Sequence, residues 1–103
     1  MIPKMLKEME RRAKDLLNSE GKLAAVKSDE KAKNMLLDYY RKQIVEAEGF
    51  AEEIQAEYVH MQNVPPDNRN DRYPAVMQEI SGDYVYVKNL VEVFKHVVES
   101  LEN

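Results

Sequence analysis

Apolar residues recur every three or four positions in two long stretches of the chain. The first stripe runs from Leu37 to Met61 and the second from Met77 to Leu101. Such spacing places apolar side chains along one side of an α-helix. The stripes consist of Leu37, Tyr40, Ile44, Ala47, Ala51, Ile54, Tyr58 and Met61, then Met77, Ile80, Tyr84, Val87, Val91, Phe94, Val98 and Leu101. The pattern predicts two matched helices whose stripes are buried against each other.

The two helices are expected at about 29–62 and about 74–102. Ser28 is a candidate N-cap for the first, because its hydroxyl can accept from the free N–H groups of the first turn. Residues 63–73 lack periodicity and combine two prolines with several turn-forming residues, so the chain should reverse direction there. At 1.5 Å per residue the helices reach roughly 50 Å and roughly 40 Å, and the single domain of residues 1–103 should therefore be an elongated antiparallel hairpin.

A shorter helix is expected before the hairpin, at about 3–19. Its apolar residues again follow helical spacing: Ile2, Leu6, Met9, Ala13 and Leu16. Gly21 is a candidate left-handed terminator for this helix. Residues 20–28 read as a connection or as a poor helical turn, and the pattern does not decide between the two. The predicted fold class is all-α, with the N-terminal helix packed on the hairpin.

The last helix carries apolar residues beyond its stripe, chiefly Tyr86, Leu90, Val93 and Val97. A helix that is apolar over most of its circumference needs neighbours on more than one side. The short first helix is not expected to cover all of this surface, so a second copy is predicted to complete the bundle as a homodimer. The same surface could instead form a groove for a helix of another protein.

Two glycines lie opposite the apolar stripes, Gly49 on the first long helix and Gly82 on the second. Glycine within a helix costs up to about 1 kcal/mol relative to alanine. Each glycine therefore indicates either the close approach of a further helix or a kink. For Gly82, which follows Ser81, a kink or a late start of the helix is the favoured interpretation.

The formal net charge of −4 hides an uneven distribution. Residues 1–45 hold eleven Lys or Arg and seven Asp or Glu, whereas residues 46–103 hold four and twelve. The basic part could fold back along the acidic part, pair with that of a second copy, or face an acidic partner. A pI near 5.2 is not typical of nucleic-acid-binding modules, so no nucleic acid partner is expected.

The composition also bears on the compartment. The chain contains no cysteine, which fits a reducing environment and excludes disulfides and thiolate metal sites. No long apolar run indicates a membrane span or an export signal. A cytoplasmic location without membrane contact is the expectation.

Acidic residues on the two long helices are the best candidates for metal-dependent catalysis. Carboxylates one turn apart on neighbouring helices can share Mg²⁺. The pairs Glu53 with Glu57 and Glu79 with Asp83 resemble the paired carboxylate motifs of the all-α nucleotide pyrophosphohydrolases of the MazG type, although that family spaces its pairs by three residues rather than four. The resemblance implies a Mg-dependent nucleoside triphosphate pyrophosphohydrolase as one alternative function. Its full ligand set would be Glu48, Glu52, Glu53, Glu57, Glu79 and Asp83.

The loop between the long helices offers a second alternative. Arg69, Asp71, Arg72 and Tyr73 combine guanidinium groups with an aromatic ring, which suits carboxylate or phosphate recognition. These arginines could equally pair with Asp67, Asp71 or the adjacent helix ends. The helix layout is similar to that of small viral proteins that sequester cyclic nucleotides between subunits. Nucleotide or anion binding between subunits is therefore a further hypothesis.

No arrangement of residues predicts a catalytic centre with comparable strength, and no cofactor is expected. The sequence favours a small non-enzymatic binding protein, such as an adaptor, a chaperone-like factor or an inhibitor. It is predicted to act through protein–protein contacts as a homodimeric helical bundle. The candidate contact residues are the loop residues Arg69, Asp71, Arg72 and Tyr73 and the helix residues Tyr86, Leu90, Val93 and Val97.

Overall fold

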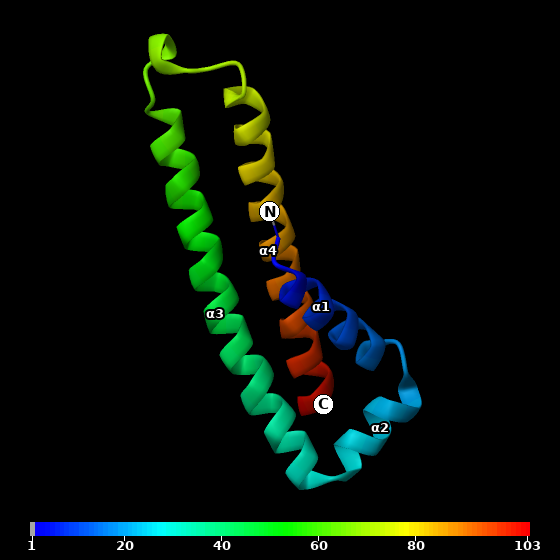
Figure 1. Ribbon diagram of the computed structural model, residues 1–103. Helices are drawn as coiled ribbons and strands as arrows, with labels where there is room; N and C mark the ends of the chain where they lie inside the picture. The colour runs from blue at the N-terminus through cyan, green and yellow to red at the C-terminus, as the bar shows by residue number, and fades with distance from the viewer. Residues whose placement is uncertain (1) are drawn as a thin grey trace.

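The computed structural model describes residues 2–103, and these residues form helices connected by short segments (Figure 1). The elements in order are α1 (Lys4–Leu17), α2 (Glu20–Ser28), α3 (Glu30–Gln62), the 3-10 helix η1 (Pro66–Asn68) and α4 (Tyr73–Glu102). No strand occurs within the described part of the chain. The predicted all-α class is confirmed. Across the same residues, no helix combines the length and the apolar character that a membrane span requires.

The two long helices, α3 and α4, lie side by side and run in opposite directions (Figure 1). The start of α3 lies beside the end of α4, where the rings of Tyr40 and Phe94 are 5.6 Å apart between centroids. A guanidinium nitrogen of Arg41 also lies 2.5 Å from a carboxylate oxygen of Glu102. The molecule measures 61 × 19 × 18 Å, so the predicted rod-shaped hairpin is confirmed.

The core follows the two predicted stripes along most of the hairpin. Because apolar side chains at this spacing share one side of each helix, they leave water when α3 and α4 pack together. The buried apolar residues are Ala13, Leu37, Tyr40, Ala47, Ala51, Ile54, Ile80, Val87, Leu90, Val91, Phe94, Val97 and Leu101. Toward the loop end, Tyr58, Met61 and Tyr84 are only partly buried, since α1 covers the other end of the rod (Figure 1).

The additional apolar surface of α4 is covered within the chain. Leu90 and Val97 are 0% exposed, and so is Ala13 on α1, which packs against α4. Tyr86 and Val93 are partly buried. The expectation that a second copy is needed to cover Leu90 and Val97 is therefore corrected. Although α1 is short, it lies across the part of α4 where these apolar residues are concentrated (Figure 1).

The segment before α3 is more regular than the sequence indicated. Residues 20–28 form α2, whose N-cap Ser19 accepts a hydrogen bond from the backbone N–H of Lys22 at 3.3 Å. Gly21 lies inside this helix without positive φ, so its predicted role as a left-handed terminator is wrong. The predicted N-cap role of Ser28 is also wrong. Asp29 caps α3 instead, because its carboxylate accepts from the N–H of Ala32 at 3.2 Å.

Both long helices continue through their glycines. Helix α3 is unbroken at Gly49, and α4 begins at Tyr73, well before Gly82. A late start of the last helix at Gly82 is therefore wrong. A Cβ added at Gly49 or Gly82 meets no atom of residues 2–103 within 4 Å. Neither glycine makes room for a neighbouring helix of the same chain.

One polar contact joins α1 to α4 and makes the stability of the fold dependent on pH. The hydroxyl of Tyr86 donates to Oε1 of Glu10 at 2.8 Å. Burial, followed by this hydrogen bond and the charge of Glu10, raises the pKa of Tyr86 to about 12. The folded protein therefore retains this proton at pH values where the unfolded chain, with an ordinary pKa of 10.0, has lost it. We expect the free energy of unfolding to fall as the pH rises from about 10 to about 12.

Urea denaturation followed by circular dichroism, repeated across this pH range, measures the effect. The variant Tyr86→Phe should lose about 0.5–1.5 kcal/mol at neutral pH, because it lacks the hydrogen bond. Its stability should also decline less steeply above pH 10 than that of the parent. Tyr84→Phe, on the same helix, is the matched control and should keep the steeper decline. If the free energy of unfolding declines equally above pH 10 in the parent and in Tyr86→Phe, the decline does not come from Tyr86.

Candidate functional site

Two of the loop residues predicted to bind an anion, Arg69 and Tyr73, already make contacts within the hairpin. Arg69 donates from Nε to the carbonyl of Val64 at 2.9 Å and from Nη2 to that of Gln62 at 3.1 Å. Its guanidinium carbon lies 4.5 Å from the centroid of the Tyr73 ring. Tyr73 in turn donates from its hydroxyl to the carbonyl of Met61 at 2.9 Å. These bonds satisfy carbonyl groups at the end of α3, which a helix leaves without partners.

The other two loop candidates lie on the surface next to this cluster. Arg72 and Asp71 are exposed, and the backbone N–H of Arg72 donates to Oδ1 of Asn70 at 3.0 Å. The structure thus brings Arg69, Arg72 and Tyr73 together around a shallow depression. The arrangement matches the alternative noted from the sequence, in which an arginine pairs with a helix end. It stabilises the reversal of the chain.

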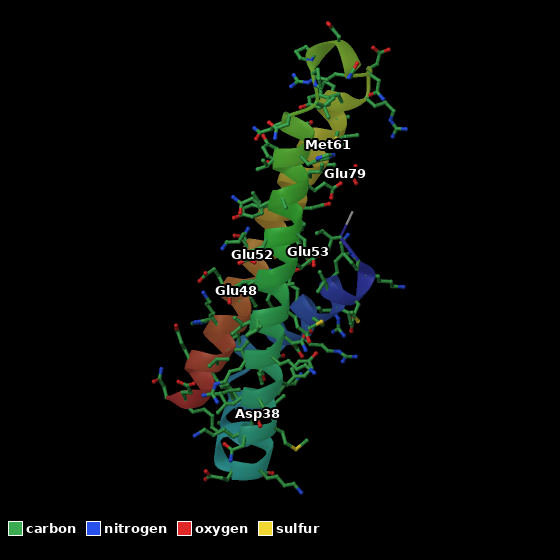
Figure 2. The ribbon with its side chains drawn as sticks, turned by 90° about the vertical axis from the view of Figure 1, so that its left-hand side faces the viewer. Asp38, Glu48, Glu52, Glu53, Met61 and Glu79 are labelled. Carbon is green, nitrogen blue, oxygen red and sulfur yellow. The ribbon has the colours of Figure 1, made fainter. Side chains whose placement is uncertain are left out.

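The acidic candidates are distributed around the hairpin rather than gathered at one point. Glu52 and Glu53 are successive residues of α3, so their side chains leave the helix about 100° apart. Figure 2 shows Glu48, Glu52 and Glu53 near the middle of the rod and Glu79 nearer its loop end. Within residues 2–103, no group of three or more His, Cys, Asp or Glu residues could hold a metal ion. The geometry offers no support for the magnesium alternative.

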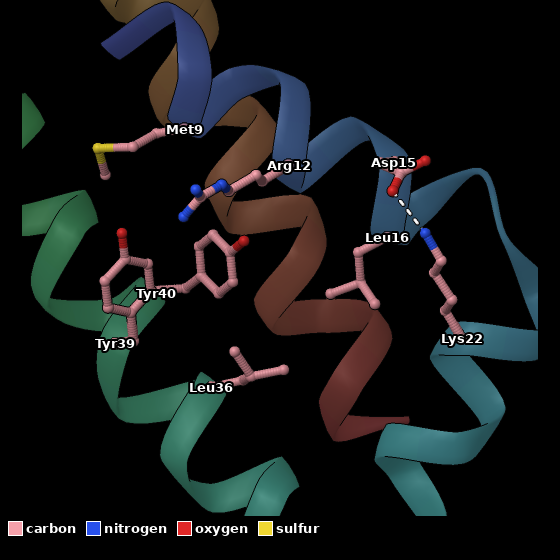
Figure 3. Close-up of a pocket in the computed structure, with 8 residues that line it drawn as sticks. All are labelled: Met9, Arg12, Asp15, Leu16, Lys22, Leu36, Tyr39 and Tyr40. Atoms are coloured by element: carbon pink, nitrogen blue, oxygen red, sulfur yellow. Dashed lines mark hydrogen bonds and ion pairs between the residues drawn. The ribbon is translucent and has the colours of Figure 1, made fainter. Parts of the chain in front are cut away.

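A cleft that the sequence did not indicate lies between α1, α2 and α3, at the end of the rod away from the loop (Figure 3). It has a volume of about 440 Å³. Its walls include the tyrosines Tyr39 and Tyr40 of α3, whose rings meet edge to face with centroids 5.1 Å apart. Apolar side chains complete the lining: Met9, Leu16 and Leu36.

Three charged residues border the cleft. Arg12 projects from α1 toward the two tyrosines (Figure 3), and its Nε lies 3.4 Å from Glu8 of the same helix. Lys22 of α2 forms an ion pair with Asp15 of α1 at 2.7 Å, which ties the two short helices together. The Lys22 hydrogen bond lowers the pKa of Asp15. The cleft therefore combines an aromatic wall with a cationic rim and one carboxylate.

Tyr40 links this cleft to the core. Its side chain is almost entirely buried, whereas Tyr39 is 44% exposed. Burial raises the pKa of Tyr40, and the neighbouring Tyr39 raises it further, while the positive charge of Arg12 acts in the opposite direction. The guanidinium of Arg12 is thus electrostatically coupled to the tyrosine wall. The adjacent tyrosines were visible in the sequence, but helical spacing assigns only Tyr40 to the stripe.

In the part of the chain that the structure describes, no other helix covers the side of α3 that faces away from α4 (Figure 2). We call this surface the outer face of α3 and define it as Lys42, Val45, Gly49, Glu52, Ala56 and Val59. Val45 is 70% exposed and Val59 is 48% exposed. Spacings of three, four and seven residues place these positions on one side of the helix. The face presents apolar and small residues, with the cation of Lys42 near one end and the carboxylate of Glu52 near the middle.

The fold defines the general class of the protein as an all-helical rod, in which two short helices pack on one end of a long antiparallel hairpin. Comparison with known protein families, with curated proteins and with solved structures finds no match to this chain.

Proposed function

We propose that this chain is a non-enzymatic binding protein that acts through protein–protein contacts as a homodimeric helical bundle. The observation that carries the proposal is the uncovered outer face of α3, where Val45 is 70% exposed. Large apolar side chains on a soluble helix commonly mark a contact surface when they are grouped. The sequence placed the dimer contact on α4, but Leu90 and Val97 are fully buried within the chain, where α1, α2 and α3 all pack against α4. The outer face of α3 is therefore proposed as the contact surface instead.

The distribution of charge favours a second copy as the occupant of this face. Residues 46–85, which form the loop end of the rod, hold nine Asp or Glu and two Lys or Arg. The opposite end contains α1, α2, the start of α3 and the end of α4. Residues 1–45 hold eleven Lys or Arg and seven Asp or Glu, and residues 86–103 hold two and three, so this end is basic. Two rods side by side in opposite directions place each acidic end beside a basic end. This arrangement gives electrostatic complementarity between copies.

An antiparallel crossing at Gly49 matches the outer face in detail. At 1.5 Å per residue, Lys42 of one copy falls opposite Ala56 of the other, one helical turn from Glu53. Lys42 and Glu53 also lie on the same flank of the face, so they meet across such an interface. Gly49 allows the two backbones to approach closely, which gives a reason for a helical glycine that no contact among residues 2–103 requires.

The proposal covers the adaptor, chaperone-like and inhibitory roles, which all depend on contacts with another protein. A cytoplasmic setting remains part of it, because the absence of cysteine fits a reducing compartment. Nucleotide or anion binding at the loop receives less support, since the Arg69 side chain is already bonded to the end of α3. The magnesium-dependent alternative also receives less support than the contact surface.

Light scattering coupled to size-exclusion chromatography tests the dimer. We expect the parent protein to have twice its monomer mass of 12.0 kDa at micromolar concentration. Gly49→Gln should weaken association at least tenfold, because a long side chain separates the two backbones. The same change should stabilise the isolated monomer by up to about 1 kcal/mol, since glutamine is a better helix former than glycine.

Gly82→Gln is the matched control. Gly82 is also open to solvent in a continuous helix, but it lies on α4, so this variant should remain dimeric. Lys42→Glu should weaken the dimer, and adding Glu53→Lys should restore it by exchanging the two charges. A monomeric parent protein would reject the proposal, and equal behaviour of the two glycine variants would reject the α3 interface.

A further inference from the structure

We propose that the cleft between α1, α2 and α3 binds a short acidic segment of another protein, through a carboxylate at Arg12 and an apolar or aromatic side chain against Tyr39. This site is separate from the outer face of α3, and the proposal does not depend on dimerisation. It follows from the joint presence of a formed cleft, an exposed aromatic ring and a positively charged surrounding surface.

The aromatic wall supplies the apolar part of the site. Tyr39 is 44% exposed although its ring packs edge to face on the buried Tyr40. A ring held in this way is fixed before any partner arrives, so little side-chain entropy is lost on binding. Leu16 of α1 and Leu36 of α3 line the same cleft and extend its apolar surface. The volume of about 440 Å³ accommodates a large side chain with part of its backbone.

Arg12 supplies the charge that selects an acidic partner. Its side chain is 72% exposed, and the 3.4 Å contact with Glu8 leaves most of its donors facing the cleft and solvent (Figure 3). An arginine beside an aromatic ring binds carboxylates through paired N–H donors. Lys22 adds a second positive charge at the rim, although it is already paired with Asp15.

The same charges favour a carboxylate over a phosphate. Asp15 lines the cleft with a lowered pKa, so it is ionised at neutral pH and repels a group with two negative charges more strongly than one with a single charge. As a whole, α1 carries five Lys or Arg and three Asp or Glu, so its net charge is +2, and Arg12 is its cation in the cleft lining. This wider positive surface complements a segment with several acidic residues, which approaches it by long-range attraction.

The experiment is a titration of the ¹⁵N-labelled full chain, followed by the amide signals in NMR spectra. The probe is the blocked peptide Glu-Glu-Phe-Leu-Glu-Glu, and the comparison peptide has lysine in place of each glutamate. We expect the acidic peptide to shift the amides of residues 12–16, 22 and 36–40. The lysine peptide should bind at least tenfold more weakly, because its positive charges are repelled by Arg12 and Lys22 of the cleft.

Substitutions locate the effect. Arg12→Glu should abolish binding of the acidic peptide, and Tyr39→Ser should weaken it at least fivefold. Arg11→Glu is the matched control, because Arg11 is the neighbouring arginine of α1 but lies outside the cleft, and it should retain binding within about threefold. The proposal is overturned if the acidic peptide shifts no cleft amides at millimolar concentration, or if Arg11→Glu and Arg12→Glu are equally affected. ATP alone is titrated as a further probe. If ATP shifts the cleft amides at lower concentration than the peptide does, the cleft is a nucleotide site instead.

Discussion

Replacing Phe94 with alanine is expected to lower the free energy of unfolding by about 3–5 kcal/mol. Phe94 is 0% exposed, and its ring contacts that of Tyr40 in the centre of the core. It also lines a depression together with Leu6 of α1 and Phe50 of α3, so it connects three helices. The substitution leaves a cavity at this junction, and the rigid helices around it cannot close the space fully.

Urea denaturation monitored by far-ultraviolet circular dichroism measures this loss. A domain of this size has a total stability of about 5–15 kcal/mol, so Phe94→Ala should remove a large part of it. Val85→Ala on the same helix is the control, because Val85 is 54% exposed and its side chain should contribute less than about 0.5 kcal/mol. Similar midpoints for the two variants would show that Phe94 is not central to the core.

The hairpin was predictable because its signal is repeated many times along the chain. Every stripe position between Leu37 and Met61 adds to the same period, and an error at one position does not change the result. The short elements lacked this redundancy. Helix α2 has only two apolar residues that pack on the core, Leu23 and Val26, so its pattern could not be distinguished from a connection. Its boundary at Ser28 and Asp29 is defined by local hydrogen bonds, among them the cap of Asp29 on the N–H of Ala32, which apolar spacing does not reveal.

The covering of α4 by α1 could not be judged from helix lengths alone. The apolar surplus of α4 is concentrated between Tyr86 and Val97, and only the structure shows that α1 lies against this part. By helical spacing, the side of α4 that carries Tyr86, Leu90 and Val97 becomes polar at Asp83 and Glu79. The short helix α1 therefore matches the apolar surface of α4 in both length and position.

The cleft residues illustrate a second limit of sequence reasoning. Arg12, Lys22 and Tyr39 come from three helices and have no common spacing, so no pattern along the chain unites them. They are brought together by the angle between α1 and α2, which the ion pair of Asp15 with Lys22 helps to fix. Arg69 was identified from the sequence, but its contacts with the end of α3 also depend on the path of the loop.

Replacing Ala13 with aspartate is expected to detach α1 from the hairpin, with a loss of about 3–5 kcal/mol for a buried charge without a partner. Ala13 is 0% exposed and is the fully buried residue of α1 in the core, so its methyl group lies within the contact between α1 and the hairpin. A carboxylate cannot be hydrated there unless α1 moves away. The hairpin keeps its own buried stripe, so α3 and α4 should stay helical after α1 has separated.

Hydrogen exchange read by mass spectrometry separates this local effect from global unfolding. Amides of residues 4–17 should exchange at least a hundredfold faster in Ala13→Asp, whereas those of the paired halves of α3 and α4 should remain protected. Ala25→Asp on α2 is the matched control, because Ala25 is exposed and the same change should leave α1 protected. Loss of protection throughout α3 and α4 would instead mean that the hairpin depends on α1 for its stability. Unchanged exchange in α1 would show that the small side chain of Ala13 does not set this contact.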